Sequence, residues 1–325
     1  MPDTATTAIR SKPAPANQQL ANQRVAWFNG KIMPESEVRI SFRDRGVKYG
    51  DGAFDTTRTF NGRIFRLKDH VDRWYRTLKY LRFDPGVSPA EMMRITEDVL
   101  ARNIHLLDKD DDYWVSQRIT RGAEGIEYLP EAPNVIVECL PLPLKARATQ
   151  FRDGIKVLTP SVRRAPPEVI SPRAKTHNYL NMIVAEQEVK SIDPTAWAVL
   201  LDVNGNLAEG IGANIFLVRD GQLLTPRLNY VLAGISRQTV IELARAAGIV
   251  VNETDIDLYD AYTADEAFLT STSLCICPVR SINGTGFDKG GLPGKVTKRL
   301  TDAYIKLVDC DFVAQHLRRL PGKSV

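Results

Sequence analysis

The sequence has little of what thiol and zinc chemistry require. It contains four cysteines and four histidines among 325 residues. The four cysteines lack the paired spacing of a zinc site, and they are Cys139, Cys275, Cys277 and Cys310. We therefore expect reduced thiols in the core and no bound metal.

Long apolar runs and a strong excess of one charge are also missing. No segment reaches the roughly 18 consecutive apolar residues of a membrane span, and the N-terminus lacks a charged start followed by an apolar stretch. The 43 Lys and Arg residues are dispersed among 39 Asp and Glu residues, so the net charge of +4 forms no concentrated basic footprint. The sequence predicts a cytoplasmic protein with neither a membrane nor a nucleic acid as partner.

What is present is the composition of a folded protein with two domains. The hydrophobic share of 43% and the charged share of 25% are ordinary for globular proteins, and 325 residues suit two domains. Residues 1–24 carry no apolar periodicity, so we expect a mobile N-terminal arm. We place a small α/β domain at 25–143, an interdomain linker at 144–150 and a larger domain at 151–325.

Turn and cap signals predict an α+β chain in both halves. Hairpin turns are expected at Asn29-Gly30, Asn61-Gly62, Asn204-Gly205 and Asp220-Gly221. Apolar residues recur at helical spacing over 67–81, and Ser88-Pro89-Ala90-Glu91 is typical of a helix start. A further helix is expected over 235–247, closed by Gly248. The hairpins of the second half predict a curved, mostly antiparallel sheet.

Two residues of the second half suggest an amine-forming cofactor. The Lys175 amine can form a Schiff base with an aldehyde, and the Glu209 carboxylate can keep a pyridine nitrogen protonated so that the ring accepts electrons. Gly234-Ile235-Ser236 begins the expected helix, where backbone amides can hold a phosphate, and Thr272 and Ser273 can add donors. A plain helix cap and a polar turn remain the alternative interpretations of these last two motifs.

Over residues 25–310, five ordered motifs make the chain similar to a known family. They are Arg43-Asp44-Arg45-Gly46 with Tyr49-Gly50-Asp51-Gly52, Lys175 with Asn178-Tyr179, Glu209 with Gly210-x-Gly212-x-Asn214, Gly234-Ile235-Ser236-Arg237, and Pro293-Gly294-Lys295-Val296-Thr297. The chain resembles the fold-type IV pyridoxal phosphate enzymes, which include branched-chain and D-amino acid aminotransferases, R-selective amine transaminases and aminodeoxychorismate lyase. This resemblance implies a two-domain fold, a pseudo-barrel of mostly antiparallel strands in the larger, cofactor-binding domain, and a homodimer or a higher homo-oligomer.

The resemblance also implies a role for each matching residue. Lys175 would be the Schiff-base lysine, Glu209 the partner of the pyridine nitrogen, and Tyr179 the neighbour of the ring hydroxyl. The implied phosphate contacts are Arg73, Ile235, Ser236 and Thr272, and Ser273 is kept beside them as a further candidate donor at the end of a strand. His177 is two residues from the lysine, but we expect Lys175 itself to move the substrate proton.

The substrate pocket is expected on the strand Trp114–Arg121. Alternate residues share one face of a strand, so Trp114 and Ser116 form the expected pair. Tyr49 and Phe54 are added from the N-terminal motif. Branched-chain enzymes tend to carry an arginine at the Ser116 position, so Arg58 and Arg121 are considered as other partners for a substrate carboxylate.

These features predict an aminotransferase with ping-pong kinetics acting on a primary amine or amino acid and a 2-oxo acid. The stretch Val162–Pro167 is similar to R-selective amine transaminases, which rank first by a small margin. D-amino acid and branched-chain amino acid aminotransferases come next. A lyase with the same cofactor remains an alternative that product analysis separates. A binding protein that merely inherited the fold is disfavoured, because the complete set of candidate residues is present.

Overall fold

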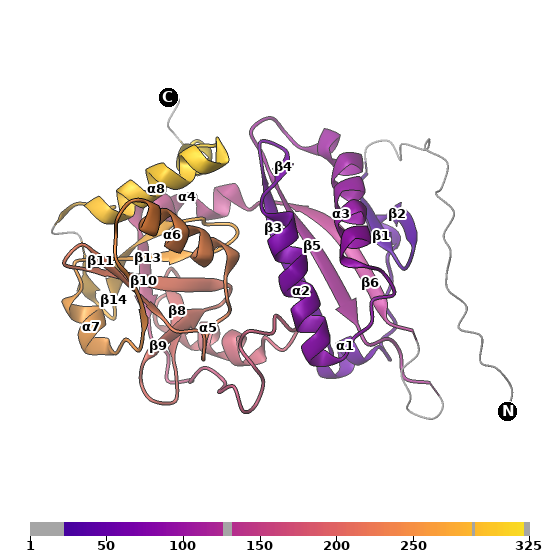
Figure 1. The fold of residues 1–325 in the computed structure, drawn as a ribbon, viewed down its shortest axis with the longest axis horizontal. Coiled ribbons are helices and arrows are strands. Elements are labelled where there is room, and N and C mark those ends of the chain that lie inside the picture. Colours follow the sequence, from indigo (N-terminus) through magenta and orange to yellow (C-terminus); the bar gives the residue numbers. More distant parts are fainter. Residues whose placement is uncertain (1–22, 126–131, 288–289, 322–325) are drawn as a thin grey trace, which may run out of the picture.

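The computed structural model describes residues 23–125, 132–287 and 290–321, and it shows two regions that each contain a sheet (Figure 1). The predicted N-terminal arm lies outside the described residues except for positions 23 and 24. The two regions lie side by side in Figure 1, where the first is coloured indigo to magenta and the second rose to yellow.

The first region is built on a six-stranded antiparallel sheet in the order β2-β1-β6-β5-β3-β4. Its strands are β1 (Val25–Phe28), β2 (Lys31–Pro34), β3 (Gly52–Phe60), β4 (Arg63–Ile64), β5 (Tyr113–Thr120) and β6 (Asn134–Pro141). Asn29-Gly30 and Asn61-Gly62 make the predicted hairpin turns, with positive φ at all four residues. Asn and Gly occupy this left-handed region most readily, which is why the turns could be located from sequence.

Helices α2 (Leu67–Leu81) and α3 (Pro89–Asn103) cover one face of this sheet. Trp74 and Val71 of α2 are fully buried there, and the Ser88 side chain caps α3 by accepting from the Glu91 amide, as predicted. The short α1 (Arg45–Tyr49) precedes β3, and two 3₁₀ turns, η1 (Glu35–Glu37) and η2 (Ile104–Leu106), complete the region. One face of β5 therefore packs in a core, which leaves its alternate residues for the other side of the sheet.

The second region contains a closed barrel of six strands, in the order β10-β13-β14-β7-β8-β9, because β9 pairs back onto β10. These strands are β7 (Ile155–Leu158), β8 (Trp197–Leu201), β9 (Leu207–Gly210), β10 (Ala213–Arg219), β13 (Glu266–Thr270) and β14 (Cys277–Ile282). Only β7 pairs in parallel within the barrel, with β14 and β8, so the predicted mostly antiparallel pseudo-barrel is confirmed. Three further strands extend the sheet, β11 (Gln222–Pro226), β12 (Val251–Thr254) and β15 (Thr285–Gly286).

Six helices surround this barrel in the described part of the second half. They are α4 (Leu144–Asp153), α5 (Leu180–Ile192), α6 (Ile235–Ala246), α7 (Leu258–Thr263), α8 (Lys295–Val308) and α9 (Phe312–Leu317). The expected linker 144–150 thus forms part of α4, which packs against α9. The domain bounds themselves remain a prediction.

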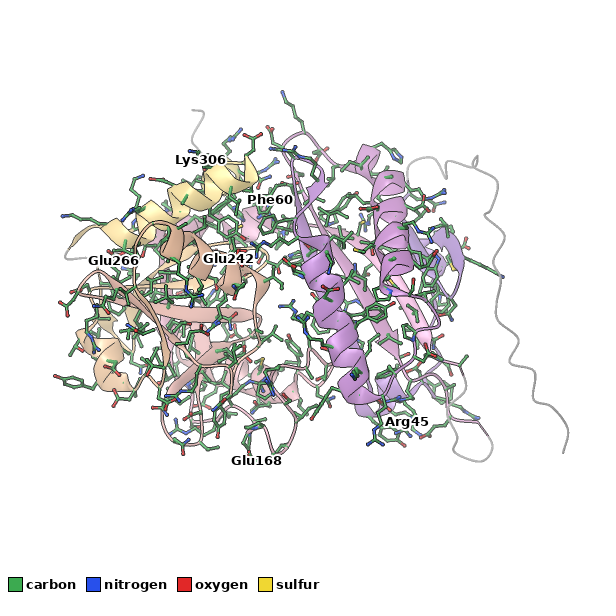
Figure 2. All side chains as sticks on the ribbon, viewed as in Figure 1. Arg45, Phe60, Glu168, Glu242, Glu266 and Lys306 are labelled. Carbon is green, nitrogen blue, oxygen red and sulfur yellow. The ribbon has the colours of Figure 1, made fainter. Side chains whose placement is uncertain are left out.

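Aromatic side chains join the two regions. Phe60, at the end of β3, lies 6.5 Å from the ring of Tyr304 in α8 and belongs to the core of the second region. Figure 2 shows Phe60 at this boundary, and it shows Glu242 of α6 on the side facing α2, where it pairs with Arg66. Within the described ranges, no helix is both long enough and apolar enough to cross a membrane.

Candidate active site

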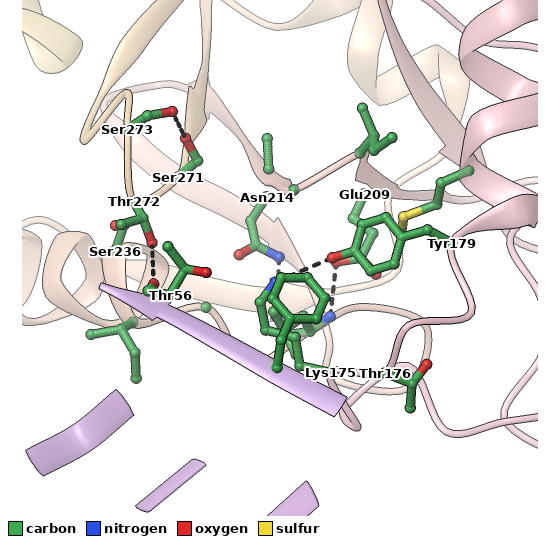
Figure 3. A pocket seen from close by; sticks show the side chains of 18 of the residues that line it. Thr56, Lys175, Thr176, Tyr179, Glu209, Asn214, Ser236, Ser271, Thr272 and Ser273 are labelled. Carbon is green, nitrogen blue, oxygen red and sulfur yellow. Dashed lines mark hydrogen bonds between the residues drawn. The ribbon is translucent and has the colours of Figure 1, made fainter. Parts of the chain in front are cut away.

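A cavity of about 380 Å³ lies between strands β3 and β5 of the first region and one end of the barrel. Its wall includes the loop that carries Lys175, the end of β9 with Glu209, and the start of α6 (Figure 3). Segments more than 200 residues apart in the chain therefore meet at one site.

The backbone around Lys175 is held by the first region. The Phe54 amide donates to the Lys175 carbonyl at 3.1 Å, and the His177 amide donates to the Gly52 carbonyl at 2.9 Å, so the loop runs as an extra pairing partner of β3. The Lys175 amide in turn donates to Thr77 Oγ1 of α2 at 3.2 Å. Helix α5 begins only at Leu180, so Lys175 lies in the loop before the helix.

The Lys175 amine points into an aromatic environment. Its Nζ donates to the hydroxyl of Tyr179 at 3.1 Å and lies 4.3 Å from the centre of the Phe54 ring. Figure 3 shows Lys175 and Tyr179 side by side with Glu209 behind them. The structure thus brings Tyr179 to the lysine.

Glu209 is almost fully buried, at 4% exposure, and both of its oxygens are occupied. Arg164 Nε donates to Oε1 at 3.0 Å and the Leu232 amide donates to Oε2 at 2.9 Å. Burial raises the pKa of Glu209, while Arg164 and the Leu232 amide act in the opposite direction. Arg164 was missed by the sequence analysis, because nothing local to residue 164 indicates a partner 45 positions away.

The opposite end of the cavity is rich in hydrogen-bond donors. Helix α6 starts at Ile235 with Gly234 as its N-cap and has no side-chain cap, so its first amides remain available to an anion. Ser236 lines the cavity from this helix, and Thr272 and Ser273 line it from the loop after β13. A Cβ at position 234 would overlap with the Asn214 amide oxygen, which explains the glycine.

Arg73, which is also expected at the phosphate, has protein partners on all three of its nitrogens. Its Nε and one Nη donate to the two oxygens of buried Asp55 at 2.8 and 2.7 Å, and the other Nη donates to the Ala233 carbonyl at 3.0 Å. Arg73 therefore holds the residue before Gly234 as well as lining the cavity. Its direct contact with a phosphate stays a prediction.

These groups fit pyridoxal phosphate. An amine and a buried carboxylate lie at one end and a set of hydroxyls and free helix amides at the other. The hydroxyl of Thr270 also lines the cavity, is buried, and has no hydrogen-bond partner among the described residues. An orphaned polar atom of this kind indicates a polar ligand in the cavity.

Three of the four expected substrate residues line the cavity. They are Phe54, Trp114 and Ser116, and the Ser116 hydroxyl lies 2.9 Å from that of Thr56. Tyr49 does not line it, because it lies on α1 at 54% exposure with its ring beside Arg45 and Lys48. Within the part of the chain that the structure describes, no contact brings Tyr49 to the site.

The two arginines considered as carboxylate partners are placed elsewhere, which corrects that expectation. Arg58 is fully buried and donates to Asp112 and Gln315, and Arg121 pairs with Asp51 and lies over the Phe83 ring. Neither lines the cavity. Both arginines bind partners inside the protein, and the residues next to them in the sequence do not indicate these partners.

Arg118 lines the cavity in their place. It shares the face of β5 with Trp114 and Ser116, so the same alternation that selected those two residues could have found it. Arg118 Nε donates to Glu138 Oε1 of β6 at 2.6 Å. A second missed guanidinium, Arg147 of α4, lies 4.5 Å from the Trp197 ring.

His177 does not line the cavity. Its ring lies 5.6 Å from the Phe54 ring, and its buried Nε2 has no hydrogen-bond partner among the described residues. Burial, reinforced by Arg118, lowers the pKa of His177 to about 4, which keeps the ring neutral near pH 7. This position agrees with the preference for Lys175 as the group that moves the substrate proton.

Comparisons with known proteins agree with this geometry. The family model described as amino-transferase class IV matches residues 52–282. A protein of Methanocaldococcus jannaschii, whose name gives branched-chain-amino-acid aminotransferase as a provisional activity, is 36% identical over 86% of this chain and 94% of its own length. The branched-chain-amino-acid aminotransferase of Escherichia coli K12 is 31% identical over 86% of this chain and 92% of its own length.

Solved structures give the same result. A crystal structure of the Escherichia coli branched-chain amino acid aminotransferase superposes with a TM-score of 0.81 at 31% identity, over 88% of this chain and 95% of that one. The branched-chain amino acid aminotransferase from Thermobaculum terrenum, solved in its holo form with pyridoxal phosphate, gives a TM-score of 0.77 at 28% identity, over 92% of this chain and 96% of that one. The fold and the cofactor expected from the sequence are confirmed.

Proposed function

Since the chain belongs to the class IV aminotransferases, which act with pyridoxal phosphate on amino acids and 2-oxo acids, we propose that its amino donor is an amino acid with an apolar, branched side chain. The observation that carries this proposal is the apolar wall formed by Phe54, Trp114 and Leu140 in the same cavity as Lys175. Relatives named as branched-chain aminotransferases support it.

The roles of the chain's own residues follow from their positions. Pyridoxal phosphate supplies an aldehyde that takes up the amino group and a ring that accepts the electron pair of the substrate Cα. Lys175 would bind the cofactor covalently and, once displaced by the substrate amine, move the proton at Cα, because its Nζ reaches the cavity. Glu209, held by Arg164 and the Leu232 amide, would fix the charge at the ring nitrogen.

The phosphate would be held at the other end of the cavity. The free amides at the start of α6 and the hydroxyl of Ser236 are suitable donors. The Thr272 hydroxyl donates to the Thr56 carbonyl at 3.1 Å and would have to turn toward the phosphate. Because the amino group stays on the enzyme between two half-reactions, kinetics of the ping-pong type are expected.

A second candidate is an R-selective amine transaminase. Ser116 presents a hydroxyl where a guanidinium is common among branched-chain enzymes, and a donor without a carboxylate would need no cation there. The lyase alternative uses the same cofactor residues and differs in its products.

A homodimer is also part of the proposal. Phe42, Val47 and Tyr49 expose apolar surface on and beside α1, at 77%, 61% and 54%. Neighbouring apolar side chains of this kind favour a protein contact. Sedimentation of the purified protein would give a single monomeric species if this part is wrong.

The test is a panel of donors with the purified holoenzyme. L-leucine, D-alanine, L-glutamate and both enantiomers of 1-phenylethylamine are supplied with pyruvate or 2-oxoglutarate, and kcat/KM and products are measured. We expect L-leucine to give the highest kcat/KM among the donors other than L-glutamate. A higher value for (R)-1-phenylethylamine would favour the second candidate, and cleavage of aminodeoxychorismate in the absence of any 2-oxo acid would favour the lyase.

A further inference from the structure

Four guanidinium groups line the cavity, and they differ in how fully they are engaged. Arg73 has Asp55 and the Ala233 carbonyl as partners, and Arg164 holds Glu209. Arg118 and Arg164 each donate through Nε alone, Arg118 to Glu138. Among the contacts of the described residues, the Nη groups of both have no hydrogen-bond partner, but 38% of the Arg118 side chain is exposed against 11% of that of Arg164.

Arg118 is also close to the reacting end of the cavity. Its Cζ lies 5.3 Å from the centre of the Phe54 ring, and the Lys175 Nζ lies 4.3 Å from the same centre. The cross-strand register places Arg118 opposite Phe54 and Ser116 opposite Thr56. Arg118 therefore lies two residues beyond the serine along β5, on the face that meets the lysine.

From these contacts we propose that Arg118, oriented by Glu138, binds the carboxylate that is attached to the reacting carbon of the amino acid and of the 2-oxo acid. The two Nη groups of a guanidinium match the two oxygens of a carboxylate, and such paired, charge-assisted hydrogen bonds are among the strongest available. This inference rests on the proposed function and names the residue that selects substrates bearing a carboxylate.

Glu138 stabilises the charged guanidinium of Arg118 in the site before a substrate binds. Its carboxylate balances the charge of Arg118 and holds the guanidinium through Nε, which leaves both Nη groups for a ligand in the cavity. Glu138 is thus a positioning residue, and Arg118 makes the contact.

The other arginines fit this role less well. Arg147 lies over the Trp197 ring at 4.5 Å, and none of the contacts among described residues links it to Lys175 or Phe54. Arg58 and Arg121 are bound to Asp112 and Asp51. Arg147 is therefore the comparison variant.

The experiment separates the two half-reactions of the holoenzyme of wild type, Arg118→Gln, Arg118→Lys and Arg147→Gln. The pyridoxal form is mixed rapidly with L-leucine or with a carboxylate-free amine, and the pyridoxamine form with 2-oxoglutarate, and the absorbance of the bound cofactor is followed. We expect Arg118→Gln to raise the half-saturating concentration of L-leucine and of the 2-oxo acid by about 10- to 100-fold. The reaction with the amine should change by no more than about twofold, and Arg118→Lys should lie between.

A binding measurement that needs no turnover completes the test. Titration calorimetry with 4-methylpentanoate, a carboxylate that cannot react, should show the same loss of affinity in Arg118→Gln and a smaller loss in Glu138→Gln. Unchanged affinity in Arg118→Gln, or a loss found instead in Arg147→Gln, overturns the inference. Wild-type enzyme that transaminates neither L-leucine nor any other amino acid would sink the proposed function, and the 2-oxo acid half-reaction would still decide the role of Arg118.

Discussion

Arg73 of α2 and Asp55 of β3 form a buried, two-bonded ion pair, with nitrogen to oxygen distances of 2.8 and 2.7 Å. The pair is completed by His70, whose Nδ1 lies 2.7 Å from the same carboxylate. Through the Ala233 carbonyl, Arg73 also reaches the residue before the N-cap of α6. A buried ion pair in the first region thus holds the end of the cavity that we propose for the phosphate, which lies in the second region.

Asp55→Asn tests this link through its pH dependence. Burial alone would raise the pKa of Asp55, but Arg73 and His70 hold it far below its ordinary range. A carboxyl whose pKa is lower in the folded than in the unfolded protein stabilises the fold at pH values above its unfolded pKa of about 3.9. This stabilisation is lost progressively as the pH falls below that pKa. We expect Asp55→Asn to lower the free energy of unfolding by about 3–5 kcal/mol at pH 7, and by less at acidic pH.

Urea unfolding of the apoprotein at pH 7 and below pH 4 measures this difference. Asp69→Asn is the matched control, because Asp69 lies on α2 with about half of its side chain exposed. A gap between wild type and Asp55→Asn that stays constant with pH would contradict the assigned cause.

Lys175→Ala should abolish covalent attachment of the cofactor. Its Nζ is the cavity amine beside Tyr179, and losing both the attachment point and the proton carrier should lower kcat/KM by at least about 10²- to 10⁴-fold. Borohydride treatment followed by mass spectrometry should find the added cofactor mass on wild type and on Lys298→Ala, an exposed control in α8. Cofactor mass retained on the alanine variant at position 175 would place the attachment elsewhere.

His177→Asn should leave kcat within about tenfold of wild type, because the removal of a true general base would lower kcat by about 10²- to 10⁴-fold. The pKa of His177 is lowered to about 4 by burial, so the fold favours the neutral ring. Its contribution is present above the unfolded pKa of about 6.5 and is lost as pH falls from there toward 4. The melting temperature of wild type should therefore drop more than that of the variant over this interval, and parallel curves would argue against a buried neutral ring.

Gly234→Ala should weaken cofactor binding. A Cβ at this position would overlap with the Asn214 side chain, so the start of α6 must shift at a cost of about 1–3 kcal/mol. Gly290→Ala is the control, because nothing lies within 4 Å of a Cβ there. Equal cofactor dissociation constants for the two variants, measured by equilibrium dialysis, would show that the close approach is unimportant.

Local signals were sufficient for many elements of the fold. The Asn-Gly turns, the Ser88 cap and the helix that starts at Ile235 all depend on residues a few positions apart, and each is found where it was expected. Such features can be read from a chain because their energetics are settled within one turn of structure. The helix α4, by contrast, was expected as a linker, and its contact with α9 involves residues more than 150 positions later.

The same distinction between local and long-range information applies to the residues of the active site. Residue types and their order were enough to select Lys175 and Glu209 and to infer the cofactor, because Schiff-base formation and charge at a pyridine nitrogen each require a particular functional group. The partners of the arginines needed the folded chain: Arg164 on Glu209, Arg118 on Glu138 and Arg58 on Asp112 are long-range pairs. Each pair depends on which strands lie together and which side chains are desolvated, and no short stretch of residues encodes either property.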